Sequence, residues 1–152
     1  MKNAIKKAGE IIRDRSAASP TFGVNNDHYC VLAQEDVDGM LTASVITASK
    51  SDGIQWINFC TGLSGNKVKR IKRDSRAAVC FESDSYSITL KGHLKVLTDG
   101  ETKRENWYSG IEDHFAGPDD PNYCVLRFTT DKYSLFVDWE EITGTLDVSG
   151  VS

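Results

Sequence analysis

The chain has 152 residues, of which 39% are hydrophobic and 26% charged, with a formal net charge of −4 and a pI near 5.3. This length and composition are typical of one soluble globular domain with a single core, and we expect one domain over residues 1–152. The negative net charge argues against nucleic acid or an acidic membrane as a partner of the whole molecule.

The N-terminal segment predicts an amphipathic helix. Ile5, Ala8 and Ile11 recur at helical spacing between Lys and Arg residues over 2–15, so these residues share one face. The small residues and the proline that follow end the helix, and we treat 1–20 as a helix with its connector. The segment lacks the continuous apolar stretch of a signal peptide, which favours a cytoplasmic location.

Two hairpins are predicted next. HYCVLAQ, residues 28–34, has the composition of a strand, and the turn residues 36–39 separate it from the β-prone run 41–48. Asp52-Gly53 is a second turn signal and leads into IQWINFC, residues 54–60. The first half of the chain is therefore expected to contain three strands joined by two hairpin turns.

The segment FCTGLSGNKVKRIKRD, residues 59–74, runs from a strand end through a glycine-bearing loop, where Ser64 is placed to cap a helix. Between residues 67 and 76 six basic residues stand against one acidic residue. Such a loop offers backbone N–H groups to a phosphate, with Lys67 as the cation and Thr61 as a hydroxyl donor. The alternative is an ordinary cap and a solvated basic helix face, and the residues leave both open.

The second half of the chain predicts further strands. AAVCFE reads as a buried strand, and YSITLKGHLKV alternates apolar and polar residues, with Gly92 allowing a bend. Asp99 opens a helix that we expect to run through Trp107, and a proline-bounded loop precedes the strands YCVLRF and YSLFV. The C-terminal stretch is a candidate for one more strand.

The pattern as a whole predicts a mainly β protein: a β-barrel of six or seven antiparallel strands with inserted helices. No apolar run approaches the roughly 18 residues of a membrane span. Four cysteines stand singly in apolar runs, which is typical of reduced thiols in the cytoplasm. The three histidines lack the spacing of metal ligands, and the paired acids at 119–120 and 140–141 are typical of solvated loops. We therefore expect no metal site, and no catalytic residue stands out.

The order of these motifs resembles the pyridoxamine 5'-phosphate oxidase-like family of FMN-binding split barrels. The segments that carry the resemblance are VLAQEDVDGMLTASVI, FCTGLSGNK followed by RDSRAAVCFE, and ITLKGHLKVLTD. Trp107, Phe115 and the loop AGPDDPNYCVLRF resemble the general stress protein branch of that family. The resemblance covers residues 24–137, which we expect to form the core of the domain.

The resemblance implies a homodimer of Greek-key split barrels with FMN at the subunit interface. Related barrels bind deazaflavin F420 or haem, so these two cofactors are alternatives to FMN. By position, the residues implied to bind FMN are Ser44, Val45 and Ile46 along the flavin ring, Cys60 and Thr61 on the next strand, and Gly65, Asn66 and Lys67 at the phosphate. True pyridoxamine phosphate oxidases carry an Arg where Ser44 stands and a substrate-contacting Lys where Ser49 stands. Oxidation of vitamin B6 is therefore not expected, and the C-terminal Trp of the stress-protein branch is Phe136 here.

Three functions follow from these observations. The leading hypothesis is an FMN-binding oxidoreductase in which the flavin takes electrons from a donor, such as a nicotinamide, and passes them to an unidentified small substrate. The second is a non-catalytic flavin-binding or carrier module on the same barrel. The third is a nucleic-acid binder that uses the basic helix 67–76, which the net charge disfavours. Cys60 is either redox-active or inert packing, and the second is the more common role of a buried strand cysteine.

Overall fold

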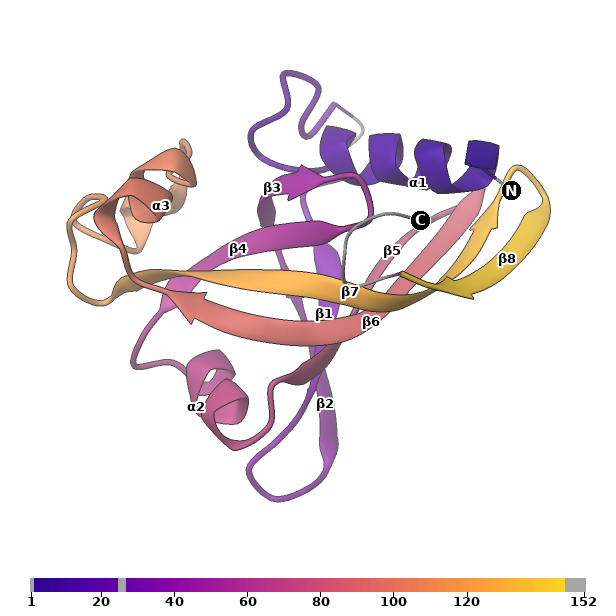
Figure 1. The fold of residues 1–152 in the computed structure, drawn as a ribbon. Coiled ribbons are helices and arrows are strands. Elements are labelled where there is room, and N and C mark those ends of the chain that lie inside the picture. The colour runs from indigo at the N-terminus through magenta and orange to yellow at the C-terminus, as the bar shows by residue number, and fades with distance from the viewer. Residues whose placement is uncertain (1, 25–26, 147–152) are drawn as a thin grey trace.

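The computed structural model describes residues 2–24 and 27–146 (Figure 1). The elements of this part of the chain are α1 (Lys2–Asp14), β1 (Cys30–Glu35), β2 (Leu41–Ile46), β3 (Ala48–Asp52), β4 (Trp56–Gly62), α2 (Asn66–Arg73), β5 (Arg76–Ser83), β6 (Tyr86–Leu97), α3 (Gly100–Glu105), the short 3-10 helix η1 (Ile111–Asp113), β7 (Tyr123–Val137) and β8 (Glu140–Thr145). The helix predicted over 2–15 and both predicted hairpins are confirmed.

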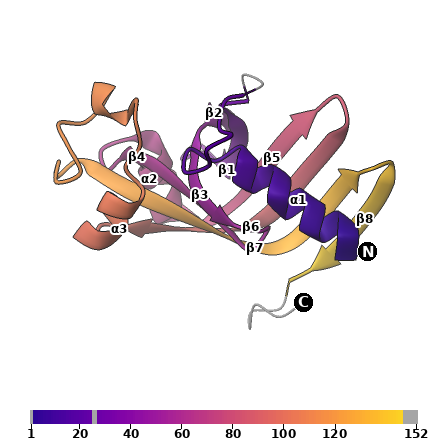
Figure 2. The same ribbon diagram turned by 90° about the horizontal axis from the view of Figure 1, so that it is seen from above.

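The strands form one sheet in the order β2-β1-β5-β6-β7-β4-β3, with β8 added beside β7, and each strand pairing is antiparallel. β2 and β3 stand at opposite ends of this order, yet Thr47 alone separates them along the chain. The sheet must therefore curl until its two ends meet, as the view from above shows (Figure 2). The prediction of a mainly antiparallel barrel is confirmed.

Two predicted strand boundaries are wrong. The run 41–48 is not one strand: the chain bends at Thr47, whose hydroxyl donates to the carbonyl oxygen of His28 at 3.0 Å, and β2 and β3 pair with different neighbours. YCVLRF and YSLFV are not two strands but the ends of one 15-residue strand, β7. β7 stays extended because β6 pairs along both halves, while β4 pairs with its first half and β8 with its second. These two changes cancel in the strand count, and β8, in the C-terminal stretch that was a candidate for one more strand, gives the described chain eight strands rather than six or seven.

Gly92 permits the bend that the sequence predicts for β6. The pairing of β6 with β7 shifts register between Lys91 and Gly92. A Cβ atom on Gly92 would lie 1.9 Å from the carbonyl oxygen of Thr129, so no larger residue fits without moving the backbone. The close approach of the two strands at this point therefore requires glycine.

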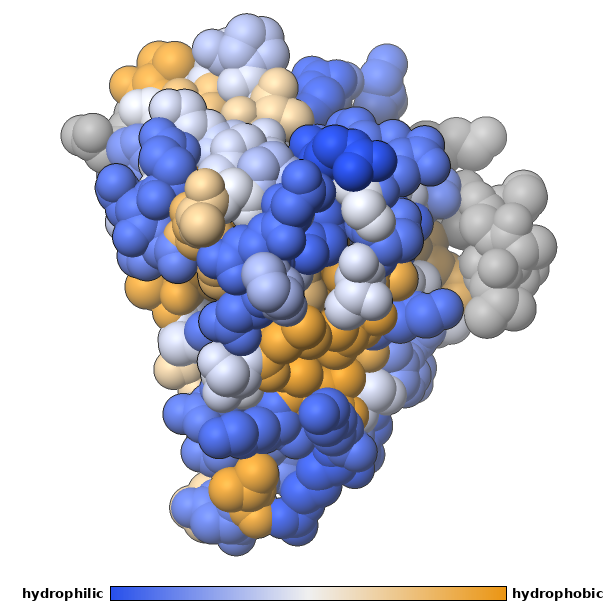
Figure 3. Space-filling model, turned by 90° about the vertical axis from the view of Figure 1, so that its left-hand side faces the viewer, coloured by the Kyte–Doolittle hydropathy of each residue, from blue (hydrophilic) through white to orange (hydrophobic). Residues whose placement is uncertain are grey.

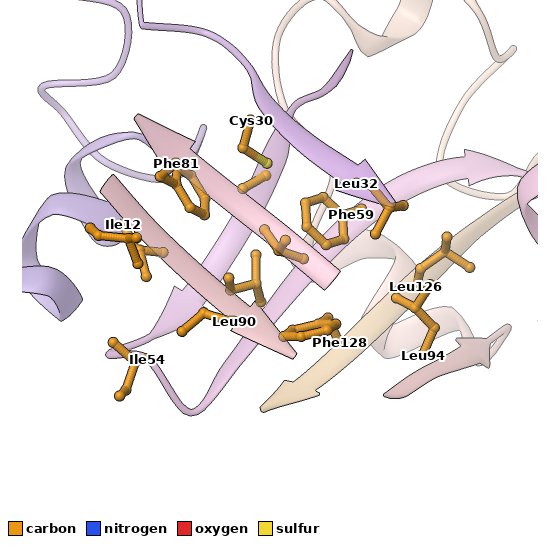
Figure 4. Packing of buried hydrophobic residues seen from close by; sticks show 14 of the residues in the cluster. Ile12, Cys30, Leu32, Ile54, Phe59, Phe81, Leu90, Leu94, Leu126 and Phe128 are labelled. Atoms are coloured by element: carbon orange, nitrogen blue, oxygen red, sulfur yellow. The ribbon is translucent and has the colours of Figure 1, made fainter. Parts of the chain in front are cut away.

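The core lies inside the curl of the sheet, where aromatic and aliphatic side chains from most strands meet (Figure 4). Phe59, Phe81 and Phe128 are each at most 1% exposed. α1 closes one side with Ala8 and Ile12, both fully buried, which accounts for its amphipathic pattern. Among the described residues, no helix is long and apolar enough to span a membrane.

A second, smaller apolar cluster lies beneath the α3 segment. Ile111, Tyr123 and Val125 form it, and Trp107 and Phe115 pack against them. The Asp99 carboxylate caps α3 by accepting from the backbone N–H of Thr102 at 3.0 Å, as predicted. α3 ends at Glu105 rather than at Trp107. The N–H of Asn106 still donates to the Thr102 carbonyl oxygen, but that of Trp107 donates only three residues back, to Arg104, so the α-helical pattern stops. The cluster ties the loop before β7 to the end of the barrel where β4 ends.

Candidate functional site

The loop between β4 and α2 forms a tight corner that is held by hydrogen bonds to one residue. The backbone N–H of Leu63 donates to the carbonyl oxygen of Asn122 at 2.7 Å, and that of Ser64 donates to the Asn122 side-chain oxygen at 3.0 Å. Gly65 then turns the chain, and a Cβ atom there would be only 3.2 Å from the Gly62 carbonyl oxygen. The loop that the sequence singles out is thus held in a defined conformation at the end of the barrel.

Ser64 does not cap α2, so that prediction is wrong. Gly65 is the cap residue, with φ −82° and ψ 168°, and no side chain of the described residues hydrogen-bonds to the start of the helix. The first helical bond runs from the N–H of Lys69 to the Gly65 carbonyl oxygen at 3.3 Å. Ser64 fails as a cap because its backbone is held by Asn122 one residue too early. The N–H groups of the first turn are therefore left without a side-chain acceptor, and they attract an anion.

Lys67 supplies a cation at this helix start. The side chain is half-buried, and burial lowers the pKa of its ammonium, with a further contribution from the charge of Arg70. Among the described residues, no acidic group pairs with this ammonium. A partly desolvated lysine without a counter-ion favours an anion beside it, because the anion restores the lost solvation of the charge.

The arginines of the basic segment have partners within the chain. Arg70 pairs with Asp36 at 3.2 Å, Arg73 lies 3.8 Å from Glu35 and also donates to the Val37 carbonyl oxygen, and Arg76 pairs with Asp74 at 2.7 Å. The hydrogen bonds from Arg76 lower the pKa of the Asp74 carboxyl to about 2. The three arginines among the six basic residues of 67–76 therefore hold the β1–β2 turn and the start of β5 in place. The lysines carry the positive charge of this segment that is not paired with an acidic residue in the described part of the chain.

The three β2 residues that the sequence assigns to the flavin ring do not share one face. Ser44 lies opposite Leu32 and Ile46 opposite Cys30, on the core side of the sheet, while Val45 lies opposite Val31 on the outer side. Ser44 and Val45 are exposed, and Ile46 is half-buried. Within residues 2–24 and 27–146, β2 pairs on one side only, with β1, so its other edge offers backbone N–H and C=O groups to a ligand.

The fold brings these residues toward the corner. The chain passes from Ile46 through Thr47 into β3, where Ala48 pairs with Phe59, the residue before Cys60. Cys60 and Thr61 lie near the end of β4, which ends at Gly62, four residues before the start of α2. On the side of the molecule that carries α2 and α3, the surface is apolar in the middle and hydrophilic around it (Figure 3). A ligand with a flat apolar part and a charged end would suit a side of the molecule that combines an apolar area with the start of α2.

Sequence reasoning missed Gln34. It follows Cys30 and Leu32 on the core-facing side of β1 and is 4% exposed, and its Nε2 donates to the Lys67 carbonyl oxygen at 3.1 Å. The signal was present: a polar residue occupies the third inward position of an otherwise apolar strand face. The partner could not be read from the sequence, because it lies 33 residues away on α2.

Cys60 sits in a polar setting at the end of β4. Its thiol lies 3.3 Å from the carbonyl oxygen of Asn106 and 3.4 Å from the hydroxyl of Tyr123, and burial raises its pKa. Burial also raises the pKa of Tyr108 to about 12. The thiol is thus held protonated at neutral pH, which is typical of a packing cysteine rather than a nucleophile.

We expect Cys60 to resist alkylation in the folded protein at pH 8. A thiol with a raised pKa yields little thiolate at that pH, and the thiolate is the reacting species. Mass spectrometry after treatment with iodoacetamide should show Cys60 modified far more slowly than in the same protein unfolded in urea. Modification at the rate of the unfolded chain would contradict this description of its surroundings.

The Tyr123 hydroxyl is expected to contribute about 1 kcal/mol to stability. It is buried and donates to the Lys103 carbonyl oxygen at 2.7 Å, and a hydrogen bond of this kind contributes about 0.5–1.5 kcal/mol. Tyr123→Phe should therefore lower Tm by about 2–4 °C in calorimetry. Tyr29→Phe, in which the ring is exposed, serves as the control, and an equal change in both variants would refute the assignment.

The fold is an antiparallel split barrel, and the turn between β4 and α2 places Lys67 at a helix start that has no side-chain cap among the described residues. The family model described as "Pyridoxamine 5'-phosphate oxidase like" matches residues 22–147, and the chain belongs to this family. No curated protein sequence matches the chain.

Solved structures share the fold. A protein of Clostridium acetobutylicum related to general stress protein 26 is 24% identical, with a TM-score of 0.71, over 82% of this chain and 89% of its own. General stress protein 26 of Bacillus anthracis is 16% identical, with a TM-score of 0.74, over 93% of this chain and 98% of its own. A pyridoxamine 5'-phosphate oxidase-related, FMN-binding protein of Nostoc punctiforme is 13% identical, with a TM-score of 0.62, over 82% of this chain and 84% of its own.

Proposed function

We propose that the protein binds FMN and uses it in oxidoreductase chemistry on a small substrate. The observation that carries the proposal is the uncapped start of α2 beside the half-buried, unpaired Lys67. In this proposal the N–H groups of Asn66 and Lys67, the Lys67 ammonium and the Thr61 hydroxyl hold the phosphate. Gly65 shapes the turn beneath it, because its own N–H donates to the Gly62 carbonyl oxygen at 3.0 Å. Family membership and the FMN-binding Nostoc relative support FMN over F420 or haem.

The flavin ring is proposed to lie against the open edge of β2. Ser44 and Ile46 face the core side and Val45 the outer side, so a flat ring contacts this strand through its backbone edge rather than through one row of side chains. Cys60, near the end of β4, is proposed to contact the flavin ring from the neighbouring side of the site. The bound flavin would supply the redox chemistry, accepting and returning electrons, and the described residues would position it and exclude water.

Phosphate contacts alone are too weak for the proposed binding. Charge-assisted hydrogen bonds contribute roughly 1.5–3 kcal/mol each, so three of them give about 5–9 kcal/mol. Association costs an estimated 4–15 kcal/mol, while micromolar affinity requires about 8 kcal/mol net. Burial of the ring must supply the difference, and one exposed strand edge buries a single face of it. A second protein surface over the ring is therefore part of the proposal.

The outer face of β1 and β2 is the surface that we propose for a homodimer. Leu41 is 85% exposed and Val45 63% exposed, and cross-strand pairing places them on the same face as Ala33 and Val31. An open groove of about 470 Å³ continues this face across β5 and β6, past Ala33, Leu41 and Ala78. Charged residues of β5, β6 and β7, among them Arg76, Lys91 and Lys132, border the groove, and exposed apolar side chains with a polar border are typical of an interface. The flavin would lie where this face meets that of the second copy.

The structure weakens the case for a nucleic-acid binder. Arg70, Arg73 and Arg76 already contact Asp36, Glu35 and Asp74, so half of the basic block is not free to contact phosphates. The oxidoreductase hypothesis and the flavin-carrier hypothesis place the flavin at the same site. They differ only in whether the bound flavin turns over. We keep a cytoplasmic location as part of the proposal.

The test is to purify the protein, record its visible spectrum and identify by mass any chromophore that a denaturant releases. We expect a yellow preparation, or a colourless one that takes up added FMN. Repeated reduction of the flavin by NADPH and reoxidation by an acceptor would support the oxidoreductase, whereas binding without turnover would favour the carrier. A preparation that neither contains nor binds flavin would contradict the proposal.

A further inference from the structure

We propose that Gln34 is a positioning residue of the flavin site. It ties the first turn of α2 to the β1–β2 hairpin, and so fixes the phosphate-binding corner relative to the ring-binding strand. The expected effect of Gln34 on FMN affinity rests on the proposed function. The expected effect of Gln34 on the position of α2 concerns the flavin-free protein and does not.

The contact of Gln34 is unusual for its place in the fold. Its side chain points to the core side of β1 and is 4% exposed, and a buried amide there costs free energy unless it is hydrogen-bonded. Its Nε2 donates to the Lys67 carbonyl oxygen at 3.1 Å. That carbonyl lies in the first turn of α2 and can accept from the helix itself four residues later. The helix therefore does not need Gln34 to satisfy its hydrogen bonds, and the added bond fixes where α2 lies.

Two further contacts extend this tie along the same side of α2. Arg70, whose side chain is 13% exposed, donates to the two Asp36 carboxylate oxygens at 3.2 and 3.5 Å. These bonds lower the pKa of the Asp36 carboxyl. Arg73 donates to the Val37 carbonyl oxygen. Lys67, Arg70 and Arg73 are spaced by three residues and follow one side of the helix. Gln34 is the contact nearest to the anion-binding turn.

Gln34 is also connected, through the β1–β2 ladder, to the strand that is proposed to bind the ring. Gln34 pairs with Thr42 in the β1–β2 ladder, and Ser44 stands two residues further along β2. The phosphate and the ring of FMN are joined covalently, so both halves of the site must be correctly spaced for one molecule to occupy both. Riboflavin lacks the phosphate and needs the ring half alone. Loss of positioning should therefore weaken FMN binding selectively, whereas general destabilisation would weaken both ligands.

The binding experiment compares Gln34→Met with wild type in the full-length protein. Methionine keeps the length of the side chain and removes the hydrogen bond. We expect the FMN dissociation constant to rise about three- to tenfold, as for loss of one hydrogen bond, with that of riboflavin within about twofold. Leu32→Met, on the same inward face of β1, is the matched control and should leave both ligands within about twofold. Equal losses for FMN and riboflavin in Gln34→Met would overturn the inference.

Hydrogen exchange in the flavin-free protein supplies the second readout. We expect the amides of residues 69–73 to exchange faster in Gln34→Met than in wild type and Leu32→Met, because α2 is held less firmly. Unchanged exchange would overturn the positioning role whether or not flavin binds. Failure of the wild-type protein to bind FMN would instead refute the proposed function, and the exchange result would still decide whether Gln34 holds α2.

Discussion

Replacing Lys67 with alanine is expected to weaken FMN binding at least tenfold and to leave riboflavin binding within about twofold. The ammonium is half-buried and has a lowered pKa through burial, and its bond to a phosphate would be charge-assisted, which makes it roughly twice as strong as a neutral one. Riboflavin has no phosphate and cannot make this contact. Quenching of flavin fluorescence in a titration measures both affinities.

Lys69→Ala is the matched control for this prediction. Lys69 is exposed and stands two residues further along α2, so the variant removes the same charge from the same helix without touching the proposed phosphate site. Its FMN affinity should stay within about twofold of wild type in moderate salt, because exposed charges are screened. If Lys67→Ala and Lys69→Ala behaved alike, the phosphate would not lie at the start of α2.

Substituting aspartate for Val45 is expected to dissociate the proposed homodimer and to abolish flavin binding with it. Val45 is 63% exposed on the outer face of the edge strand β2, and in a two-fold interface the substitution places two carboxylates against apolar surface at once. Burial of like charges costs several kcal/mol, which corresponds to at least a hundredfold rise in the dimer dissociation constant. Sedimentation velocity over a concentration series measures this constant.

Thr98→Asp adds the same charge at an exposed position between β6 and α3 and should leave the assembly unchanged. Circular dichroism should show the native β spectrum in both variants, because neither site faces the core. A Val45→Asp protein that sediments as wild type would show that the outer face of β1 and β2 is not the interface. A wild-type protein that is monomeric yet binds flavin tightly would remove the need for a second surface over the ring.

The elements that local patterns govern could be predicted from the sequence. The amphipathic spacing of Ile5, Ala8 and Ile11 predicts α1, the Asp52-Gly53 turn predicts the β3–β4 hairpin, and the Asp99 cap predicts the start of α3. Gly92 predicts the irregularity of β6 because a missing side chain is a local signal. The loop that leads into α2 was likewise visible as a break between an apolar strand and a basic helix.

What could not be predicted depends on contacts between distant residues. The break at Thr47 and the unbroken course of β7 follow from which strands lie beside them, and neither has a local signal. The arginines of the basic segment looked like a free positive surface, because Asp36 and Glu35, which bind Arg70 and Arg73, stand more than 30 residues earlier. Ser64 has the residue type of a helix cap, but its backbone N–H donates to the Asn122 side-chain oxygen, 58 residues later in the chain.

The central claim is that the corner between β4 and α2 binds the phosphate of FMN. A crystal structure of the protein grown with FMN tests it most directly. We predict phosphate density within about 2.7–3.2 Å of the first backbone N–H groups of α2 and of the Lys67 ammonium, with the ring between β2 and a second copy of the chain. Density for FMN anywhere else, with this corner filled only by water, would contradict the account.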